Sequence, residues 1–112
     1  MAVVNQYKFF GVTSTAAETA TMLSPLISET IIIKSLHVTN KSASNTPTIT
    51  ITNNAFQVIN TQTLSTAASV EILTNPMVVE GNTVLQYTTA GTVTDGVVIT
   101  ISYLNIKKEV TT

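Results

Sequence analysis

Apolar and polar residues alternate with a period of two along much of the chain, which is the pattern of β-strands with one buried face. The clearest case is Thr46–Asn53, where threonines occupy every second position and Ile49 and Ile51 lie between them. One face of this segment is therefore aliphatic and the other carries hydroxyls, as in a half-exposed antiparallel strand. We expect both isoleucines in the core and the threonines outside it.

A second strand, Thr30–Asn40, has an interrupted apolar face. Ile32, Leu36 and Val38 share one parity, and Lys34 falls on the same face. Because lysine is almost never fully buried unless it is paired, we expect the strand to bend or to change its partner at Lys34.

The C-terminal strand, Val97–Ile106, changes phase along its length. Odd-numbered residues such as Ile99 and Ile101 form its first apolar face, whereas Leu104 and Ile106 are even-numbered. A slip of one residue moves every following side chain to the opposite face. The pattern therefore predicts a β-bulge in this strand, or a strand shared between two sheets.

Turn signals separate several shorter strands. Asn75-Pro76, Gly81-Asn82 and Asp95-Gly96 are dipeptides typical of turns. The predicted strands between such signals are Phe56–Thr61, Val70–Leu73, Met77–Glu80 and Val84–Thr89. About eight short strands at this spacing predict an all-β fold, an antiparallel β-sandwich of jelly-roll type. Residues 1–112 are expected to form it as a single domain.

The N-terminal residues 1–21 combine two patterns. Tyr7, Phe9 and Phe10 form an apolar cluster in a first strand, while Gly11–Thr21 contains small polar residues without periodicity. The second segment is interpreted as an extended arm. Aromatic side chains dominate both cores and binding hot spots. The cluster is therefore either one end of the core or a set of candidate interface residues.

Composition supports the all-β prediction and excludes several classes of partner. Thr, Val and Ile make up 46 of the 112 residues, and all three are β-branched and favour strands. Charged residues are only 10%, with five Lys, no Arg and a net charge of −1, so we expect no nucleic-acid partner. We also expect no membrane partner, because no apolar run approaches the ~20 residues of a membrane-spanning helix and residues 1–8 do not resemble a secretory signal.

Groups that could support catalysis or bind metal are few and dispersed. His37 is the only histidine and there is no cysteine, which excludes a two-histidine or thiolate metal site within one chain. The six acidic residues are scattered singly, and no serine lies in a Gly-x-Ser-x-Gly motif. Asn40-Lys41-Ser42 matches a glycosylation acceptor, but no secretion signal accompanies it. We expect no catalytic residue, no cofactor and no metal, hence no enzyme, and His37 as a half-exposed strand residue.

The predicted surface consists of Thr, Ser, Asn and Gln rather than of charged residues. Such a surface lacks the charge that keeps monomers apart, and it loses little solvation when it is buried in a permanent contact. With only 10% charged residues, ion pairs can supply little of an interface. We therefore expect a homo-oligomer that survives high salt.

A distinctive order of segments runs through nearly the whole chain. Its parts are Tyr7-Lys8-x-x-Gly11, Ala16–Thr19, Ile31–Asn40, Asn75–Leu85 and Val98–Ile106. In this order and pattern the chain resembles the small β-sandwich virion proteins of tailed bacteriophages, which serve as capsid decoration (cement) proteins or as tail and fibre modules.

The resemblance implies a non-enzymatic virion protein that decorates and stabilises the outer capsid surface as a homo-oligomer, expected to be a trimer. Its partners would be copies of itself and the major capsid protein, with Tyr7, Phe9 and Phe10 anchoring the N-terminal arm on a neighbouring subunit or on the capsid. A tail, neck or fibre component is the alternative within the same setting. A carbohydrate-binding β-sandwich module is the alternative from another class.

Overall fold

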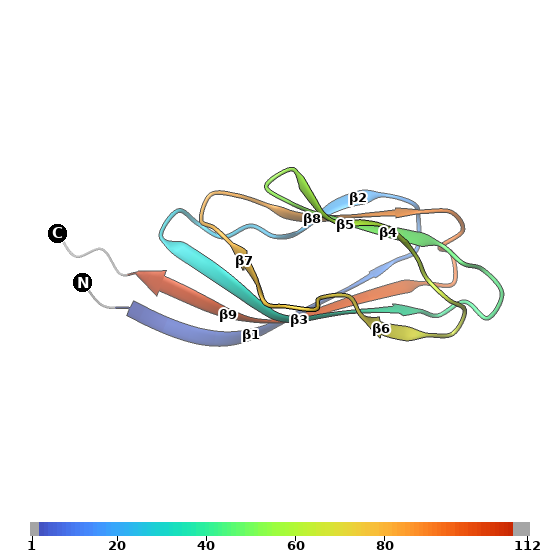
Figure 1. Cartoon of the computed structure of the whole chain (residues 1–112), viewed down its shortest axis with the longest axis horizontal. Coiled ribbons are helices and arrows are strands. Elements are labelled where there is room, and N and C mark those ends of the chain that lie inside the picture. The colour runs from blue at the N-terminus through green and yellow to red at the C-terminus, as the bar shows by residue number, and fades with distance from the viewer. Residues whose placement is uncertain (1–2, 109–112) are drawn as a thin grey trace.

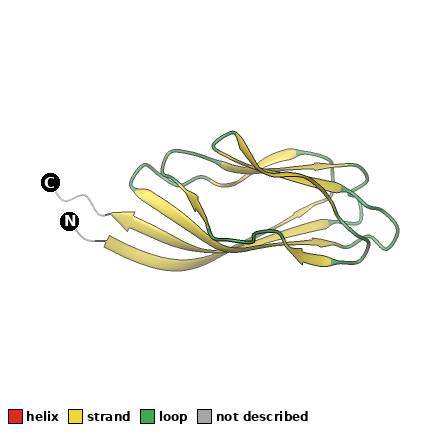
Figure 2. Cartoon of the chain, viewed as in Figure 1, coloured by secondary structure: helices red, strands yellow, loops and turns green. Residues whose placement is uncertain are grey.

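The computed structural model describes residues 3–108, which form nine β-strands and no helix (Figures 1 and 2). This confirms the all-β prediction. The strands are β1 (Val3–Ser14), β2 (Thr19–Leu23), β3 (Glu29–Asn40), β4 (Thr48–Asn53), β5 (Phe56–Thr63), β6 (Ser69–Glu71), β7 (Met77–Val79), β8 (Leu85–Ala90) and β9 (Val97–Lys108).

The strands form two antiparallel sheets that pack face to face (Figure 1). Sheet A has the order β1-β9-β3, with β6 and β7 both paired to the far edge of β3, and sheet B has the order β2-β8-β4-β5. The pairs β1–β9, β2–β8, β3–β6/β7 and β4–β5 are nested along the sequence. A long hairpin folded across two sheets in this way is a jelly roll, as the sequence predicts.

The core lies between the sheets and consists of the inward side chains of each strand. Ile49 and Ile51 of β4, and Ile99 and Ile101 of β9, have no exposed surface. The threonines at positions 48, 50 and 52 are half-buried on the opposite face of β4 and lie outside the core cluster. The predicted facing of β4 is therefore confirmed.

The prediction of an extended arm at residues 11–21 is wrong. β1 continues to Ser14 and pairs with β9 along its whole length, from Val3 opposite Lys108 to Ser14 opposite Val97. Four residues then cross to sheet B, where β2 pairs with β8. The segment has no periodicity because it leaves one sheet and enters the other, and strand pairing within the chain orders both of its ends.

A cluster of polar groups holds this crossing in place. Thr89 of β8 donates its backbone N–H to the carbonyl of Glu18 at 2.9 Å, and its hydroxyl lies 3.0 Å from that of Ser14. The phenol of Tyr87 donates to Oε1 of Glu18 at 2.8 Å. Burial raises the pKa of Tyr87, and the hydrogen bond to the Glu18 carboxylate and its charge act in the same direction. The neutral phenol is therefore the stable form at this junction.

The predicted bulge or change of sheet in the C-terminal strand is also wrong. β9 keeps its odd-numbered side chains inward as far as Asn105, which is 8% exposed. It stays in sheet A along its whole length, between β1 and β3. Leu104 and Ile106 therefore belong to the outer face of the sheet.

The irregularity lies instead on β3, at the position where Lys34 predicts a bend. The register of β3 against β9 shifts between Ile33 and Ser35, which leaves Lys34 as the extra residue of a β-bulge. Ile33 is buried before the bulge and Leu36 after it, so the inward parity changes from odd to even. Ile32 therefore faces outward and does not share a face with Leu36, contrary to the prediction.

The long strands extend sheet A beyond sheet B. The molecule measures 56 × 22 × 22 Å, and β1 and β9 project past the shorter strands of sheet B at the end where both chain ends lie (Figure 1). At this end the inward positions of sheet A carry polar residues such as Lys8, Asn105 and Lys107.

Candidate interaction surface

The three aromatic residues predicted as interface candidates lie on two faces of β1. Phe10 points between the sheets and packs against the core, so its ring belongs to the end of the core. Tyr7 and Phe9 have the opposite parity and point away from sheet B, with 80% and 68% of their surface exposed. Aromatic residues are enriched in binding hot spots, so Tyr7 and Phe9 remain the stronger candidates.

A row of apolar side chains crosses sheet A at the level of Tyr7. Tyr7 pairs with Leu104 of β9, which pairs in turn with Ile32 of β3. Ile32 pairs on its other side with Val78 of β7, which is 50% exposed. Directly opposed side chains on neighbouring strands have Cβ atoms about 4.5–5.5 Å apart. The four side chains therefore form a continuous apolar row.

Two more apolar residues widen this row. The ring of Phe9 lies over Gly11: a Cβ added to Gly11 would be 3.3 Å from the Cε2 atom of Phe9. Ile106 stands two residues along β9 from Leu104 and is half-buried. We call the whole set the outer apolar patch; it consists of Tyr7, Phe9, Ile32, Val78, Leu104 and Ile106. The bulge at Lys34 creates the patch in part, because it turns Ile32 outward.

The outer face of sheet B differs from this patch in chemistry. It presents hydroxyl and amide side chains, several of which bond to each other across strands. Hydroxyl oxygens are 2.9 Å apart in the pair Thr19 and Thr88 and 3.1 Å apart in the pair Thr50 and Thr61. The face is therefore neutral, polar and largely satisfied by its own hydrogen bonds.

β1 forms one edge of sheet A, and no strand within residues 3–108 pairs with its free side. An exposed edge of 12 residues offers a row of backbone donors and acceptors to another chain. Proteins often protect such edges with an inward-pointing lysine, and Lys8 occupies an inward position of β1.

Charged groups gather on the inner side of sheet A near the chain ends. The backbone N–H of Leu26 donates to Oε1 of Glu29 at 2.8 Å, and the Asn105 amide donates to Oε2 at 3.2 Å. The Leu26 bond is the main cause that holds the pKa of Glu29 below its ordinary value, with smaller contributions from Asn105, Lys107 and Lys8. This cluster fixes the start of β3.

The side chains of His37 and Asn40, the remaining candidates from the sequence, contact other groups of the fold. His37 Nε2 lies 3.0 Å from a carboxylate oxygen of Glu71, and the imidazole side chain is 52% exposed, in agreement with the half-exposed strand residue predicted. Asn40, in the glycosylation match, is buried and donates to backbone carbonyls, including that of Asn45 at 2.9 Å. Within residues 3–108, no group of three His, Asp or Glu side chains could hold a metal ion.

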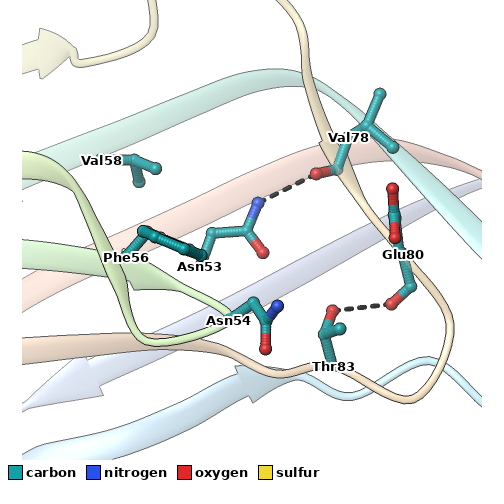
Figure 3. Close-up of a pocket in the computed structure, with 7 residues that line it drawn as sticks. All are labelled: Asn53, Asn54, Phe56, Val58, Val78, Glu80 and Thr83. Atoms are coloured by element: carbon teal, nitrogen blue, oxygen red, sulfur yellow. Dashed lines mark hydrogen bonds between the residues drawn. The ribbon is translucent and has the colours of Figure 1, made fainter.

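A pocket lies between the β4–β5 turn and the β7–β8 connection, and none of its lining residues is a site candidate predicted from the sequence. It has a volume of about 260 Å³ and is lined by Asn53, Asn54, Phe56, Val58, Val78, Glu80 and Thr83 (Figure 3). Phe56 is 71% exposed. Phe56, an aromatic residue at the start of the predicted strand Phe56–Thr61, is the one signal in the sequence that could have indicated it.

Comparison with known proteins adds no family assignment. No protein-family model matches the chain, and no curated protein matches it significantly. Among the described residues, no helix is long and apolar enough to cross a membrane.

Proposed function

We propose that this protein is a non-enzymatic structural protein that assembles into a homo-oligomer through the outer apolar patch and decorates the outside of a phage capsid. The observation that carries the proposal is the row from Tyr7 to Val78 on the open face of sheet A. The resemblance to phage virion proteins supplies the setting.

The size and chemistry of the patch support a permanent contact. A covered aromatic side chain buries about 150–250 Å², and Tyr7 and Phe9 are mostly exposed. With four aliphatic neighbours, the patch has an area on the order of several hundred Å², at the upper end for a monomeric protein. A contact of this kind is apolar at its centre and can be bordered by the neutral side chains that surround it.

A decorating oligomer stabilises a shell by mass action. A protein that binds the assembled particle and ignores the free capsid subunits shifts the equilibrium towards the particle. A jelly roll is one of the folds used by viral capsid and lectin domains, which is an analogy at the level of the fold. No catalytic group, nucleic acid or membrane is needed for this role.

Self-association can be tested by sedimentation of the full chain at about 50 mM and about 1 M salt. The wild type is expected to be oligomeric under both conditions, since a Debye length of about 3 Å at 1 M salt removes charge-driven contacts only. The Tyr7→Ala/Phe9→Ala double variant is expected to be monomeric. Phe56→Ala, which removes an aromatic residue of similar exposure from sheet B, is the control and should remain oligomeric. A monomeric wild type, or one that dissociates at high salt, would contradict the proposal.

The virion setting is tested by locating the chain in purified particles of a phage that encodes it. Cryo-electron microscopy with quantitative mass spectrometry should find many copies on the head, in symmetric clusters. A few copies on the tail would favour the tail, neck or fibre alternative and refute the capsid assignment. Absence from the particle would refute both.

A further inference from the structure

The pocket of Figure 3 lies at one side of the sandwich and is lined by residues of both sheets. Asn53, Asn54, Phe56 and Val58 come from the β4–β5 hairpin of sheet B, while the other three lining residues come from β7 and the turn that follows it. The pocket is therefore formed by the jelly-roll arrangement and not by any single loop.

Hydrogen bonds fix both walls of this pocket. The side-chain amide of Asn53 donates to the carbonyl of Val78 at 2.9 Å, and the backbone N–H of Asn54 donates to the carbonyl of Val84 at 3.0 Å. The hydroxyl of Thr83 donates to the carbonyl of Glu80 at 2.7 Å. The walls are preformed, which lowers the entropy that a ligand must overcome on binding.

The lining has an apolar side and a polar side. Phe56 and Val58 are 71% and 41% exposed and form the apolar side (Figure 3), whereas Val78 turns its carbonyl toward Asn53 and its side chain belongs to the outer apolar patch. The amide oxygen of Asn53, the side-chain amide of Asn54 and the carboxylate of Glu80 make up the polar side, and these groups form no hydrogen bond with another side chain of residues 3–108. An apolar wall with a few convergent polar groups is the usual composition of a small-molecule site.

We propose that this pocket binds a neutral pyranose, either free or as the end of a glycan. A pyranose has a face of C–H groups that can stack on the negative face of the Phe56 ring, and vicinal hydroxyls at its rim that can donate to Glu80 and bond with Asn54. The volume of about 260 Å³ lies just below the ~300–1,000 Å³ of pockets that take drug-sized ligands, which suits a single sugar ring.

The charge of the lining selects against acidic sugars. Glu80 carries the only formal charge among the seven lining residues, and none of them is basic. A uronic or sialic acid would bring a second carboxylate close to Glu80 without a cation to offset it, and like charges at short distance repel. This inference goes beyond the proposed structural role, because it assigns a ligand to the side of the molecule formed by β5 and β7.

The test is a titration of the ¹⁵N-labelled full chain with methyl glycosides of glucose, galactose, mannose and N-acetylglucosamine, and with methyl glucuronide. At least one neutral glycoside is expected to shift the amide signals of Asn54, Phe56 and Glu80 with millimolar affinity. Phe56→Ala should weaken that binding at least about tenfold. Glu80→Gln should weaken the binding of the neutral glycoside less than Phe56→Ala does. It should also raise the affinity for the glucuronide relative to that for the neutral glycoside.

Phe9→Ala is the matched control, since it removes an equally exposed aromatic residue from the other sheet and should leave the sugar affinity unchanged. The proposal fails if no neutral glycoside shifts the pocket signals, or if Phe56→Ala keeps full affinity in a folded protein. It also fails if the wild type binds the glucuronide as tightly as the neutral sugars. If Phe56→Ala changes the oligomeric state and no glycoside binds, the pocket holds a protein side chain instead. Loss of self-association in the Tyr7→Ala/Phe9→Ala variant with retained sugar binding would separate the two proposals.

Discussion

Replacing Gly81 with alanine should destabilise the fold, because the space at this glycine is closed by backbone atoms. A Cβ at position 81 would lie 2.6, 2.7 and 2.8 Å from the carbonyl oxygens of Leu26, Ile27 and Glu29. Gly81 does not have a positive φ, so the substitution strains the packing and not the backbone dihedral angle. The turn at Gly81 and the β2–β3 loop would have to separate, which also disturbs the 3.0 Å hydrogen bond from Asn82 N–H to the Pro25 carbonyl.

The magnitude follows from three contributions. Overpacking by one methyl group costs typically 1–3 kcal/mol, and a weakened hydrogen bond adds about 0.5–1.5 kcal/mol. The smaller conformational freedom of alanine in the unfolded chain offsets about 0.4–1 kcal/mol. We therefore expect Gly81→Ala to lower the free energy of unfolding by about 0.5–4 kcal/mol, with a middle value of about 2 kcal/mol.

Gly11→Ala is a matched control with the same chemical change. Its Cβ would meet side-chain atoms only, the nearest being Cε2 of Phe9 at 3.3 Å, and that exposed ring can move. The unfolded-state contribution then dominates, so this variant should be between neutral and about 1 kcal/mol more stable than the wild type.

The measurement is urea unfolding followed by far-ultraviolet circular dichroism, at one protein concentration because oligomers gain stability with concentration. With a slope of about 1–3 kcal/mol per molar urea, the midpoint of Gly81→Ala should fall by roughly 1 M and that of Gly11→Ala should not fall. Equal midpoints for the two variants would refute the packing of the β2–β3 loop on Gly81.

Three further predictions concern single positions. Ile51→Ala should lower the free energy of unfolding by about 2–5 kcal/mol. Thr50→Ala should lower it by less than about 1 kcal/mol, because this change removes one exposed hydrogen bond to Thr61. If chemical denaturation ranks the two variants the other way, the facing of β4 is wrong. Ala55→Gly should raise the unfolding free energy by up to about 1 kcal/mol in the same assay, because Ala55 has a φ of 67°, which favours glycine. Glu29→Gln should lower the melting temperature most above pH 4.5. The pKa of Glu29 in the folded protein lies below its ordinary value of 4.5, so the stabilisation by the carboxylate is lost as the pH falls through the folded pKa. Melting temperatures of wild type and variant that differ equally at every pH would contradict this.

Sequence predicts best the features that one strand determines alone. The facing of β4 follows from alternation because its inner and outer sides differ at every position. The same alternation separates Phe10, which packs against the core, from its exposed neighbour Phe9. The alternation within β1 therefore divides the predicted cluster of three aromatic residues between two faces of the strand.

Features that depend on the pairing of two strands cannot be predicted fully from the alternation within one strand. The bulge lies on β3 at Lys34, where the sequence predicts a bend. Leu104 on β9 suggests a phase slip in its own strand, but β9 stays in regular register with β1 and Leu104 belongs to the outer apolar patch. β2 has no alternation in its sequence, because Met22 and Leu23 are both buried next to a shift in register. The pocket needs the placement of Val78 beside Asn53, two residues from different sheets.

The nested pairing of strands has a consequence for the order of folding. The innermost pair, β4–β5, closes through the two-residue turn Asn54-Ala55, in which both residues have positive φ, as a type I′ hairpin turn requires. The outermost pair joins Val3 to Lys108, a separation that would make folding slow if this contact formed first. If the inner pairs form first, each outer pair has only its own short connections left to close, and the entropy lost at each step is that of a small loop. The chain can therefore close from its middle outward, with the Asn54-Ala55 turn as the point at which the hairpin nucleates and the β1–β9 edge as the last part to become ordered.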